Sequence, residues 1–287
     1  MNRHDFLSGV HAAYKPRNYL EIGINDGRGL HRSHTRTIGV DPAFKITAEF
    51  ECDLKMVKAT SDDFFARNSP IARFAEGVID MAFIDGMHIF EYALRDFMNT
   101  EKLAAPSSVI VFDDMLPRTV GEAARDRHTM DWTGDVFRVI SVLEKYRPDL
   151  AVIPLDTEPT GLLLVLGADP TNTVLQDNYD AILKEFIHPD PQDVPENFLH
   201  RTDAADPFAV LATSVWADLI TARESGVRPD SVDRLTELRG GATYVSNPGD
   251  PGVWPPKRAA APKPAPRATQ PVPTLTRRVR QAIKRRL

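Results

Sequence analysis

Residues 19–27 read YLEIGINDG, an apolar run that leads directly into a glycine-rich turn. The run Tyr19–Ile22 is too short for a helix and is rich in apolar residues, which predicts a buried strand. At its end, Glu21, Gly23 and Gly27 form an ExGxxxG pattern. Ligands of open parallel sheets bind beyond the carboxyl ends of the strands, where glycine lets the backbone come close to them. The stretch therefore predicts a first strand and a ligand-binding turn.

Further short apolar runs recur along the first 170 residues and alternate with amphipathic stretches. Helices are predicted over 90–103 and 135–146, and this alternation is typical of an α/β protein with a parallel sheet between helices. The last two runs are separated only by residues 156–160, which predicts an antiparallel hairpin at the sheet edge. The fold class is therefore a Rossmann-like, doubly wound, mostly parallel seven-stranded sheet. The remaining predicted strands are 37–40, 55–59, 78–84, 109–112, 151–155 and 161–167.

The pattern changes after Gly167. Helices are predicted over 175–186 and 207–223, and the whole segment 171–246 is expected to be a helical extension that packs on the sheet domain, 1–170. Residues 247–287 are dominated first by Pro, Ala and Gly and then by basic residues. Such a composition cannot bury enough apolar surface to fold, so a linker and a disordered basic tail are expected there.

Charge is divided unevenly along the 287 residues. From Lys257 onward there are ten basic residues and no acidic ones, whereas the first 256 residues hold 25 basic and 40 acidic side chains, a net charge of −15. The body is therefore not expected to bind nucleic acid specifically. Within the tail, TLTRRVRQAIKRRL places four apolar residues on one helical face, which predicts contact with an anionic membrane surface or another polyanion. With a single cysteine, Cys52, and no apolar signal segment, a cytoplasmic location is expected, peripheral at the membrane through the tail.

The second strand, TIGVD, ends in Asp41. Asp41 follows Gly23 by 18 positions, close to the separation of about 20 at which an acid accepts the ribose hydroxyls of a nucleoside cofactor. A dinucleotide site would prefer glycine where this chain has Asn25. The acid Glu21 would repel phosphates and favours the amino-acid part of S-adenosylmethionine.

Acidic residues also follow the fourth and fifth strands. Asp85 ends the run VIDMAFID, and Asp113 and Asp114 end VIVFDD. Adjacent parallel strands end side by side, so these three carboxylates are expected to converge on a Mg²⁺ ion. His88, three residues after Asp85, is the expected general base, with Asp85 as its catalytic neighbour. The other histidines show no metal-ligand spacing and are expected at the surface: His4, His11, His31, His34, His128, His188 and His200.

Together these segments resemble a class I S-adenosylmethionine-dependent methyltransferase. The similarity is greatest to the branch that contains macrocin-type and catechol-type metal-assisted O-methyltransferases and cephalosporin hydroxylase-like proteins, and it covers about residues 1–170. It is carried by YLEIGINDGRGL, TIGVDP, KATSDDFFA, FIDGMHIFEYALRDF, VIVFDDMLP and TGDVFRVI.

The resemblance implies a role for each matching residue. In such enzymes the ExGxxxG turn and the acid after the second strand hold the cofactor, and the Ser61-Asp62 pair lies where adenine is contacted. The IDGxH segment would supply a metal ligand and a base, Asp85 and His88, and the acid pair would supply the other ligands. The cofactor residues implied are Glu21, Gly23, Asn25, Gly27, Asp41, Ser61 and Asp62.

The predicted function is metal-assisted O-methylation of a hydroxyl group on a small molecule or glycan, such as a sugar, a glycoconjugate or a secondary metabolite. Two alternatives remain open. One is a nicotinamide-dependent oxidoreductase on the same type of sheet, which Asn25 and Glu21 disfavour. The other is a non-catalytic interaction module that acts through the basic tail, which the intact Asp85, His88 and Asp114 disfavour.

Overall fold

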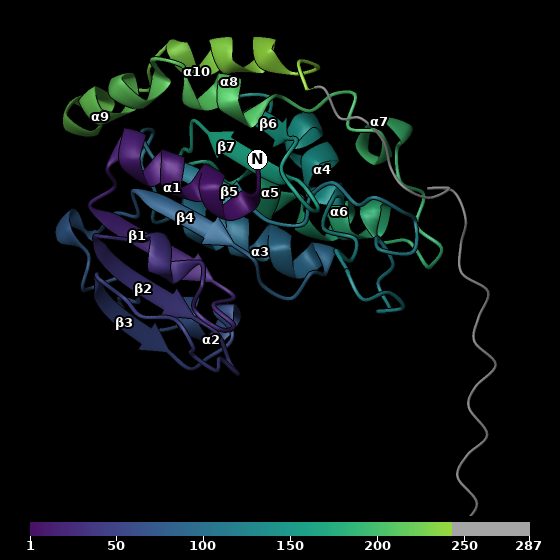
Figure 1. Cartoon of the computed structure of the whole chain (residues 1–287), viewed down its shortest axis with the longest axis horizontal. Coiled ribbons are helices and arrows are strands. Elements are labelled where there is room, and N and C mark those ends of the chain that lie inside the picture. Colours follow the sequence, from purple (N-terminus) through teal and green to yellow (C-terminus); the bar gives the residue numbers. More distant parts are fainter. Residues whose placement is uncertain (243–287) are drawn as a thin grey trace, which may run out of the picture. The chain divides into compact units, whose positions relative to one another are not determined.

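The computed structural model describes residues 1–242, and a seven-stranded sheet lies at its centre (Figure 1). The order is β3-β2-β1-β4-β5-β7-β6, and β7 alone runs antiparallel to its neighbours. The predicted fold class and edge hairpin are thus confirmed. The chain leaves β1 towards β3 and returns to β4 on the other side, which makes the β1/β4 edge the switch point where such sheets bind ligands. The strands are β1 Asn18–Ile22, β2 Arg36–Val40, β3 Asp53–Val57, β4 Met81–Ile84, β5 Val109–Phe112, β6 Ala151–Leu155 and β7 Leu162–Leu166.

Helices lie on both faces of the sheet (Figure 1). Those predicted over 90–103 and 135–146 form with shifted ends. The one predicted over 175–186 is interrupted at Asn178, whose side-chain amide donates to the Val174 carbonyl oxygen at 2.8 Å and competes with the helix ladder. The one over 207–223 is also divided in two. The helices are α1 Arg3–Tyr14, η1 Leu30–Arg32, α2 Ser61–Phe65, η2 Ala75–Gly77, α3 Phe90–Glu101, α4 Arg138–Tyr146, α5 Val174–Asp177, α6 Tyr179–Phe186, α7 Glu196–Leu199, α8 Pro207–Leu211, α9 Val215–Ser225, α10 Ser231–Arg234 and η3 Leu235–Leu238.

The two faces of the sheet are covered by different parts of the chain. On one face, α2, α3, α4 and α6 pack against the sheet through buried apolar side chains. On the other face, the connections between β1, β2 and β3 contain only the three-residue η1. On this face α1, α8 and α9 complete the core through buried side chains such as Phe6, Val210 and Trp216. The segment after β7 therefore contributes to the core over the part of the sheet formed by β4, β5, β7 and β6.

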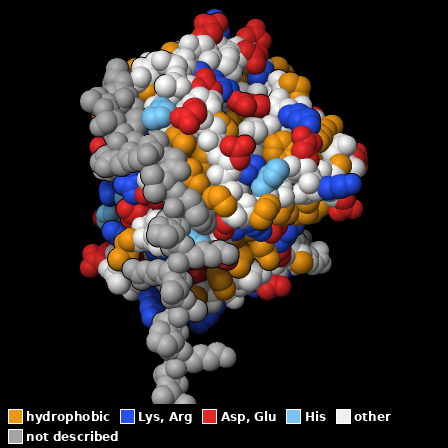
Figure 2. Space-filling view, turned by 90° about the vertical axis from the view of Figure 1, so that its right-hand side faces the viewer, with side chains coloured by type: hydrophobic (Ala, Val, Ile, Leu, Met, Phe, Trp, Pro, Cys, Tyr) orange, Lys and Arg blue, Asp and Glu red, His pale blue; other side chains and the backbone are white. Residues whose placement is uncertain are grey.

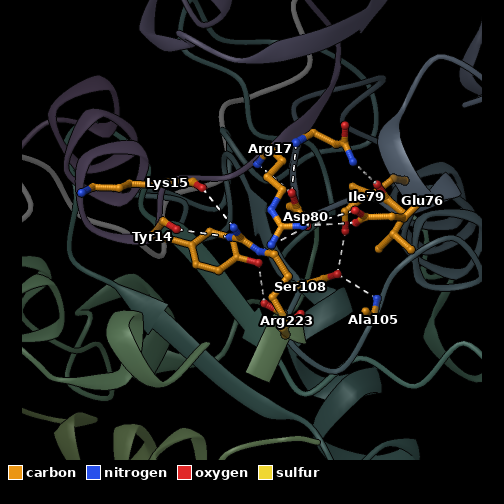
Figure 3. Close-up of polar contacts among 12 residues, drawn as sticks. Tyr14, Lys15, Arg17, Glu76, Ile79, Asp80, Ala105, Ser108 and Arg223 are labelled. Atoms are coloured by element: carbon orange, nitrogen blue, oxygen red, sulfur yellow. Dashed lines mark hydrogen bonds and ion pairs between the residues drawn. The ribbon is translucent and has the colours of Figure 1, made fainter. Parts of the chain in front are cut away.

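A buried polar network fastens α9 to the sheet (Figure 3). The Arg223 guanidinium lies 3.5 Å from the Asp80 carboxylate, and both side chains are more than nine-tenths buried. Arg223 also donates to the carbonyl oxygen of Tyr14, at the end of α1, and its guanidinium lies over the Tyr14 ring. Asp80 accepts the backbone N–H of Asn18 at 3.0 Å. One ion pair thus joins α9, α1 and the start of β1.

The surface shown in Figure 2 intersperses acidic and basic side chains, with hydrophobic ones between them. Within residues 1–242, no helix has the length and apolarity to span a bilayer. The predicted linker and basic tail, 247–287, lie outside the described residues. The surface position expected for His11 is wrong. Its side chain is buried and packs edge-on against the Tyr19 ring, and burial lowers its pKa to about 4.

Candidate functional site

A cavity of about 510 Å³ opens at the carboxyl ends of β1, β2, β4 and β5. Most of its wall comes from the residues that directly follow these strands. The segment between β5 and α4 and the β6–β7 turn close the remaining sides. The lining residues are Arg3, Gly23, Asn25, Asp41, Ala43, Asp85, Gly86, His88, Asp114, Arg127, Met130, Asp131, Trp132, Pro159 and Thr160.

The glycine turn after β1 is shaped by contact with β4. Gly23 has a φ of +86°, and a Cβ atom there would lie 1.7 Å from the Asp85 carbonyl oxygen. Only glycine fits both the dihedral angle and the contact. The Gly23 N–H donates to the Val40 carbonyl oxygen at 2.8 Å, so the turn is also tied to β2. Gly27, at φ +89°, lies next to the Phe50 ring and does not line the cavity.

Asp41 joins the second strand to this turn. Its Oδ2 atom accepts the backbone N–H of Asn25 at 2.9 Å, and its Oδ1 accepts the N–H of Ala43 at 2.6 Å. Both oxygens keep further lone pairs, and the side chain lines the cavity. The carboxylate is therefore fixed in place and still able to accept hydrogen bonds from ligand hydroxyls.

Glu21 lies beneath the turn, 2% exposed. The Tyr19 hydroxyl donates to its Oε2 at 2.7 Å. Burial, with the nearby Asp85 charge, raises the pKa of Glu21 to about 8 despite that bond. Glu21 borders a smaller hollow of about 40 Å³ next to the main cavity, together with Arg3 and Gly23. A cationic ligand group in this hollow would find a carboxyl group that ionises near neutral pH.

Asp85, His88 and Asp114 form a compact cluster on the cavity wall. The His88 Nε2 atom lies 2.9 Å from Asp85 Oδ1 and 3.2 Å from Asp114 Oδ2. The potential ligand atoms of all three residues lie within 4.8 Å of one another. His88 and Asp114 both have φ near +60°, a left-handed conformation that few non-glycine residues adopt and that is enriched at functional sites.

The imidazole of His88 is held at both ring nitrogens. Nδ1 lies 2.9 Å from the Trp132 carbonyl oxygen, and the Trp132 ring stacks on the imidazole at 5.4 Å between centroids. Burial alone would lower the pKa of His88, but the bond to Asp85 and the charge of Asp114 raise it to about 9. Because Nδ1 must donate to a carbonyl oxygen, Nε2 is the atom that can exchange a proton or bind a metal.

Asp113 lies outside this cluster. Its side chain is 1% exposed and forms an ion pair with Arg3, from the first turn of α1. Burial and the neighbouring carboxylates of Asp114 and Asp85 raise the pKa of Asp113 well above its usual range. The set of converging ligand atoms is thus Asp85, His88 and Asp114, with the imidazole in the place predicted for Asp113.

Ser61 and Asp62, at the start of α2, do not line the cavity. The Asp62 carboxylate accepts hydrogen bonds from the Arg95 guanidinium at 2.7 and 3.0 Å, and Arg95 in turn donates to the Tyr179 hydroxyl. The structure therefore brings Glu21, Gly23, Asn25, Asp41, Asp85, His88 and Asp114 to one edge of the sheet and leaves this pair apart.

Two residues of the site carry no sequence signal. Arg3 lies 110 positions from Asp113 and belongs to no motif. Thr160, in the β6–β7 turn, donates its hydroxyl to Asp114 Oδ1. The hairpin turn itself was predicted from the short separation of the last two runs, but its position beside Asp114 depends on β7 pairing with β5.

A family model described as a methyltransferase domain matches residues 20–115. That segment holds the glycine turn, Asp41, the Asp85–His88 segment and the acid pair after β5. The sequence resemblance to methyltransferases is confirmed over this segment.

Three solved structures are similar to part of the chain. One is a cofactor-bound protein, Rv0187, from MTB, with 19% identity, coverage of 59% of this chain and 82% of that one, and a TM-score of 0.45. Another is an O-methyltransferase from Bacillus cereus in complex with SAH, with 17% identity, coverage of 57% of this chain and 80% of that one, and a TM-score of 0.42. The third is the O-methyltransferase TomG from Streptomyces achromogenes, involved in tomaymycin synthesis, in complex with SAM, with 19% identity, coverage of 58% of this chain and 80% of that one, and a TM-score of 0.43. A search of curated proteins finds no match.

Proposed function

We propose that the chain transfers a methyl group from S-adenosylmethionine to a hydroxyl group with the help of a divalent metal ion, on the basis of the methyltransferase-domain model that matches residues 20–115. The observation that carries the proposal is the meeting of two sites at one cavity. The glycine turn with Asp41 forms one wall, and the Asp85, His88 and Asp114 cluster forms another.

The cofactor residues suit S-adenosylmethionine. Asp41 can accept the ribose hydroxyls, because its two oxygens are oriented by backbone N–H groups and face the cavity. Glu21 and Asp85 border the hollow beside the turn, where the ammonium group of the amino-acid part would be stabilised. The same carboxylates would repel the pyrophosphate of a dinucleotide, which argues against a nicotinamide cofactor.

The donor set of the cluster fits a divalent metal ion. The carboxylate oxygens of Asp85 and Asp114 and the Nε2 atom of His88 lie within 4.8 Å of one another. Carboxylates suit Mg²⁺ and Mn²⁺, so the two acids are the ligands for the ion, and His88 Nε2 beside them is left as the base. When bound, such an ion supplies positive charge that lowers the pKa of a neighbouring hydroxyl group. Asp85 and Asp114 would hold it.

The protein's own residues then orient and deprotonate the acceptor. In its neutral form, which its raised pKa of about 9 favours at alkaline pH, His88 takes the hydroxyl proton at Nε2, while the Trp132 carbonyl oxygen keeps Nδ1 protonated and the ring fixed. S-adenosylmethionine, when bound, would supply the methyl group from its sulfonium centre, and its sulfur would keep the electron pair of the carbon–sulfur bond. Arg127, Trp132 and Thr160 also line the cavity, and these polar groups suit a hydroxylated compound such as a sugar or a glycoconjugate.

Calorimetry with S-adenosylmethionine, S-adenosylhomocysteine and NAD tests the cofactor. Binding of the first two and not the third is expected. Transfer of a labelled methyl group to a panel of sugars and phenols, with Mg²⁺, with Mn²⁺ and with EDTA, then tests the acceptor and the metal. Binding of NAD alone would overturn the proposal, and transfer unaffected by EDTA would overturn the role of the metal.

A further inference from the structure

Arg3 is a cation inside an acidic site. It lines both the main cavity and the small hollow beside the glycine turn. The carboxylates of Asp85, Asp113 and Asp114 surround it, and their charges raise its pKa despite partial burial. Arg127, the other arginine that lines the main cavity, donates to the Met130 carbonyl oxygen.

The fold holds Arg3 in place from both ends. Its backbone N–H donates to the Glu158 carbonyl oxygen at 3.2 Å, and the Asn2 side chain caps the helix that it begins. Phe6 and Leu7, in the next turn of α1, are fully buried against the sheet. At the far end, the guanidinium forms an ion pair with the buried Asp113. Such a side chain is fixed before any ligand arrives.

An ion pair through one nitrogen leaves other donors of the guanidinium free. Nη1 of Arg3 contacts Asp113. A guanidinium carries five N–H donors in a rigid fork, a shape that matches a carboxylate. The hollow that Arg3 shares with Glu21 and Gly23 is the place proposed above for the amino-acid part of the cofactor, which carries an ammonium and a carboxylate group.

We propose that Arg3 binds the α-carboxylate of the methionine part of S-adenosylmethionine and that Asp113 positions Arg3 for this contact. The inference rests on the proposed function and adds the residue that recognises the anionic end of the cofactor. Glu21 and Asp85 would face the ammonium group, so the two ends of the amino acid meet opposite charges from β1, β4 and α1.

A comparison of two ligands that differ only in this carboxylate tests the assignment. Calorimetry is carried out with S-adenosylmethionine and with decarboxylated S-adenosylmethionine on the full chain and on Arg3→Gln. We expect Arg3→Gln to weaken S-adenosylmethionine about 10- to 100-fold, the loss typical of a hydrogen bond between charged groups. Affinity for the decarboxylated compound should change less than about threefold.

Two further variants control for charge and folding. Lys45→Ala removes a positive charge beside the same turn, where the Lys45 N–H donates to the Asn25 carbonyl oxygen at 2.8 Å. The exposed Lys45 side chain lines neither the cavity nor the hollow, so this variant should leave the ratio of the two affinities unchanged. The double variant Arg3→Gln with Asp113→Asn avoids an unpaired buried carboxylate and should show the same loss for S-adenosylmethionine alone.

The outcomes separate this assignment from the proposed function. Suppose that the unaltered chain binds both ligands. If the Arg3 variants then lower the affinity for both ligands equally, or for neither ligand, the carboxylate assignment is overturned while the proposed cofactor stands. If the unaltered chain binds neither ligand, both are overturned. A selective loss for S-adenosylmethionine supports the assignment.

Discussion

The Asp41 carboxylate accepts the backbone N–H of Asn25 at 2.9 Å, so the end of β2 fixes the conformation of the turn after β1. Asn25 needs this support because its φ is +43°. The acid expected to bind the ribose therefore also shapes the backbone against which the cofactor would lie.

Asp41→Ala should weaken binding of S-adenosylmethionine by about 1–3 kcal/mol, because ligand hydroxyls lose a charged acceptor. Asp41→Asn keeps one oxygen and should lose less. Calorimetry measures both. Equal affinities of Asp41→Ala and the unaltered chain would contradict the ribose role.

Asp85→Asn and Asp114→Asn should each lower the affinity for Mn²⁺ and Mg²⁺ and abolish metal-dependent transfer, because each removes a charged oxygen ligand. Cofactor affinity should stay within a few-fold in Asp114→Asn. The matched control is Asp131→Asn, which alters an acid of the same cavity that pairs with Arg118 and stands outside the cluster. Manganese binding can be followed by electron paramagnetic resonance, and a cluster variant that binds Mn²⁺ normally would exclude this site.

The raised pKa of Glu21 predicts a pH-dependent affinity. Burial holds this pKa at about 8, and only the ionised carboxylate attracts an ammonium group. Affinity for S-adenosylmethionine should therefore increase as pH rises towards 8, with release of a proton on binding. Calorimetry in two buffers of different ionisation enthalpy measures that proton. Glu21→Gln should bind more weakly and lose the dependence.

In the ligand-free protein, the raised pKa of Glu21 predicts that stability falls as pH rises, whereas cofactor affinity increases. The protonated Glu21 carboxyl group stabilises the folded protein fully at pH values below 4.5, its pKa in the unfolded chain. This contribution is lost as pH rises through about 8, its pKa in the folded protein. Glu21→Gln should therefore show a flatter dependence of melting temperature on pH over this interval.

Arg223→Ala should lower the free energy of unfolding by about 3 kcal/mol or more, because it leaves the buried Asp80 without its cation. The matched control is Arg17→Ala. Arg17 pairs with Glu224 on the same helix, but at the exposed surface, so its loss should matter little. Urea denaturation of both variants decides the comparison, and similar losses would argue against the buried network.

The basic tail gives a separate prediction from its charge alone. The full chain should sediment with vesicles of anionic lipid, and a chain ending at Pro256 should not, because it lacks all ten basic residues from Lys257 onward. Raised salt should weaken the binding by screening. Neutral vesicles are the control. Vesicle binding that survives the truncation would assign the contact to the body.

The strands were predictable because each short apolar run is bounded by polar or turn-forming residues. The residues that follow the strands were expected to lie together, because parallel strands end at the same edge of a sheet. Asp41, Asp85 and Asp114 were found in this way. Arg3 could not be found, because its contact with Asp113 depends on how α1 crosses the sheet and not on any local pattern. His88 was predicted as a base, but its contacts with both Asp85 and Asp114 depend on the conformation of the turn after β4, which no local sequence pattern specifies.

The contribution of α8 and α9 to the core on one face of the sheet limits how this protein can be divided or recombined. A chain ending after β7 would contain the whole matched segment and yet expose Met81, Phe83 and Val111 to water. Exchange of the C-terminal region between related enzymes would therefore have to preserve the apolar contacts with α1. The part of the chain that follows the sheet thus belongs to the core of the protein.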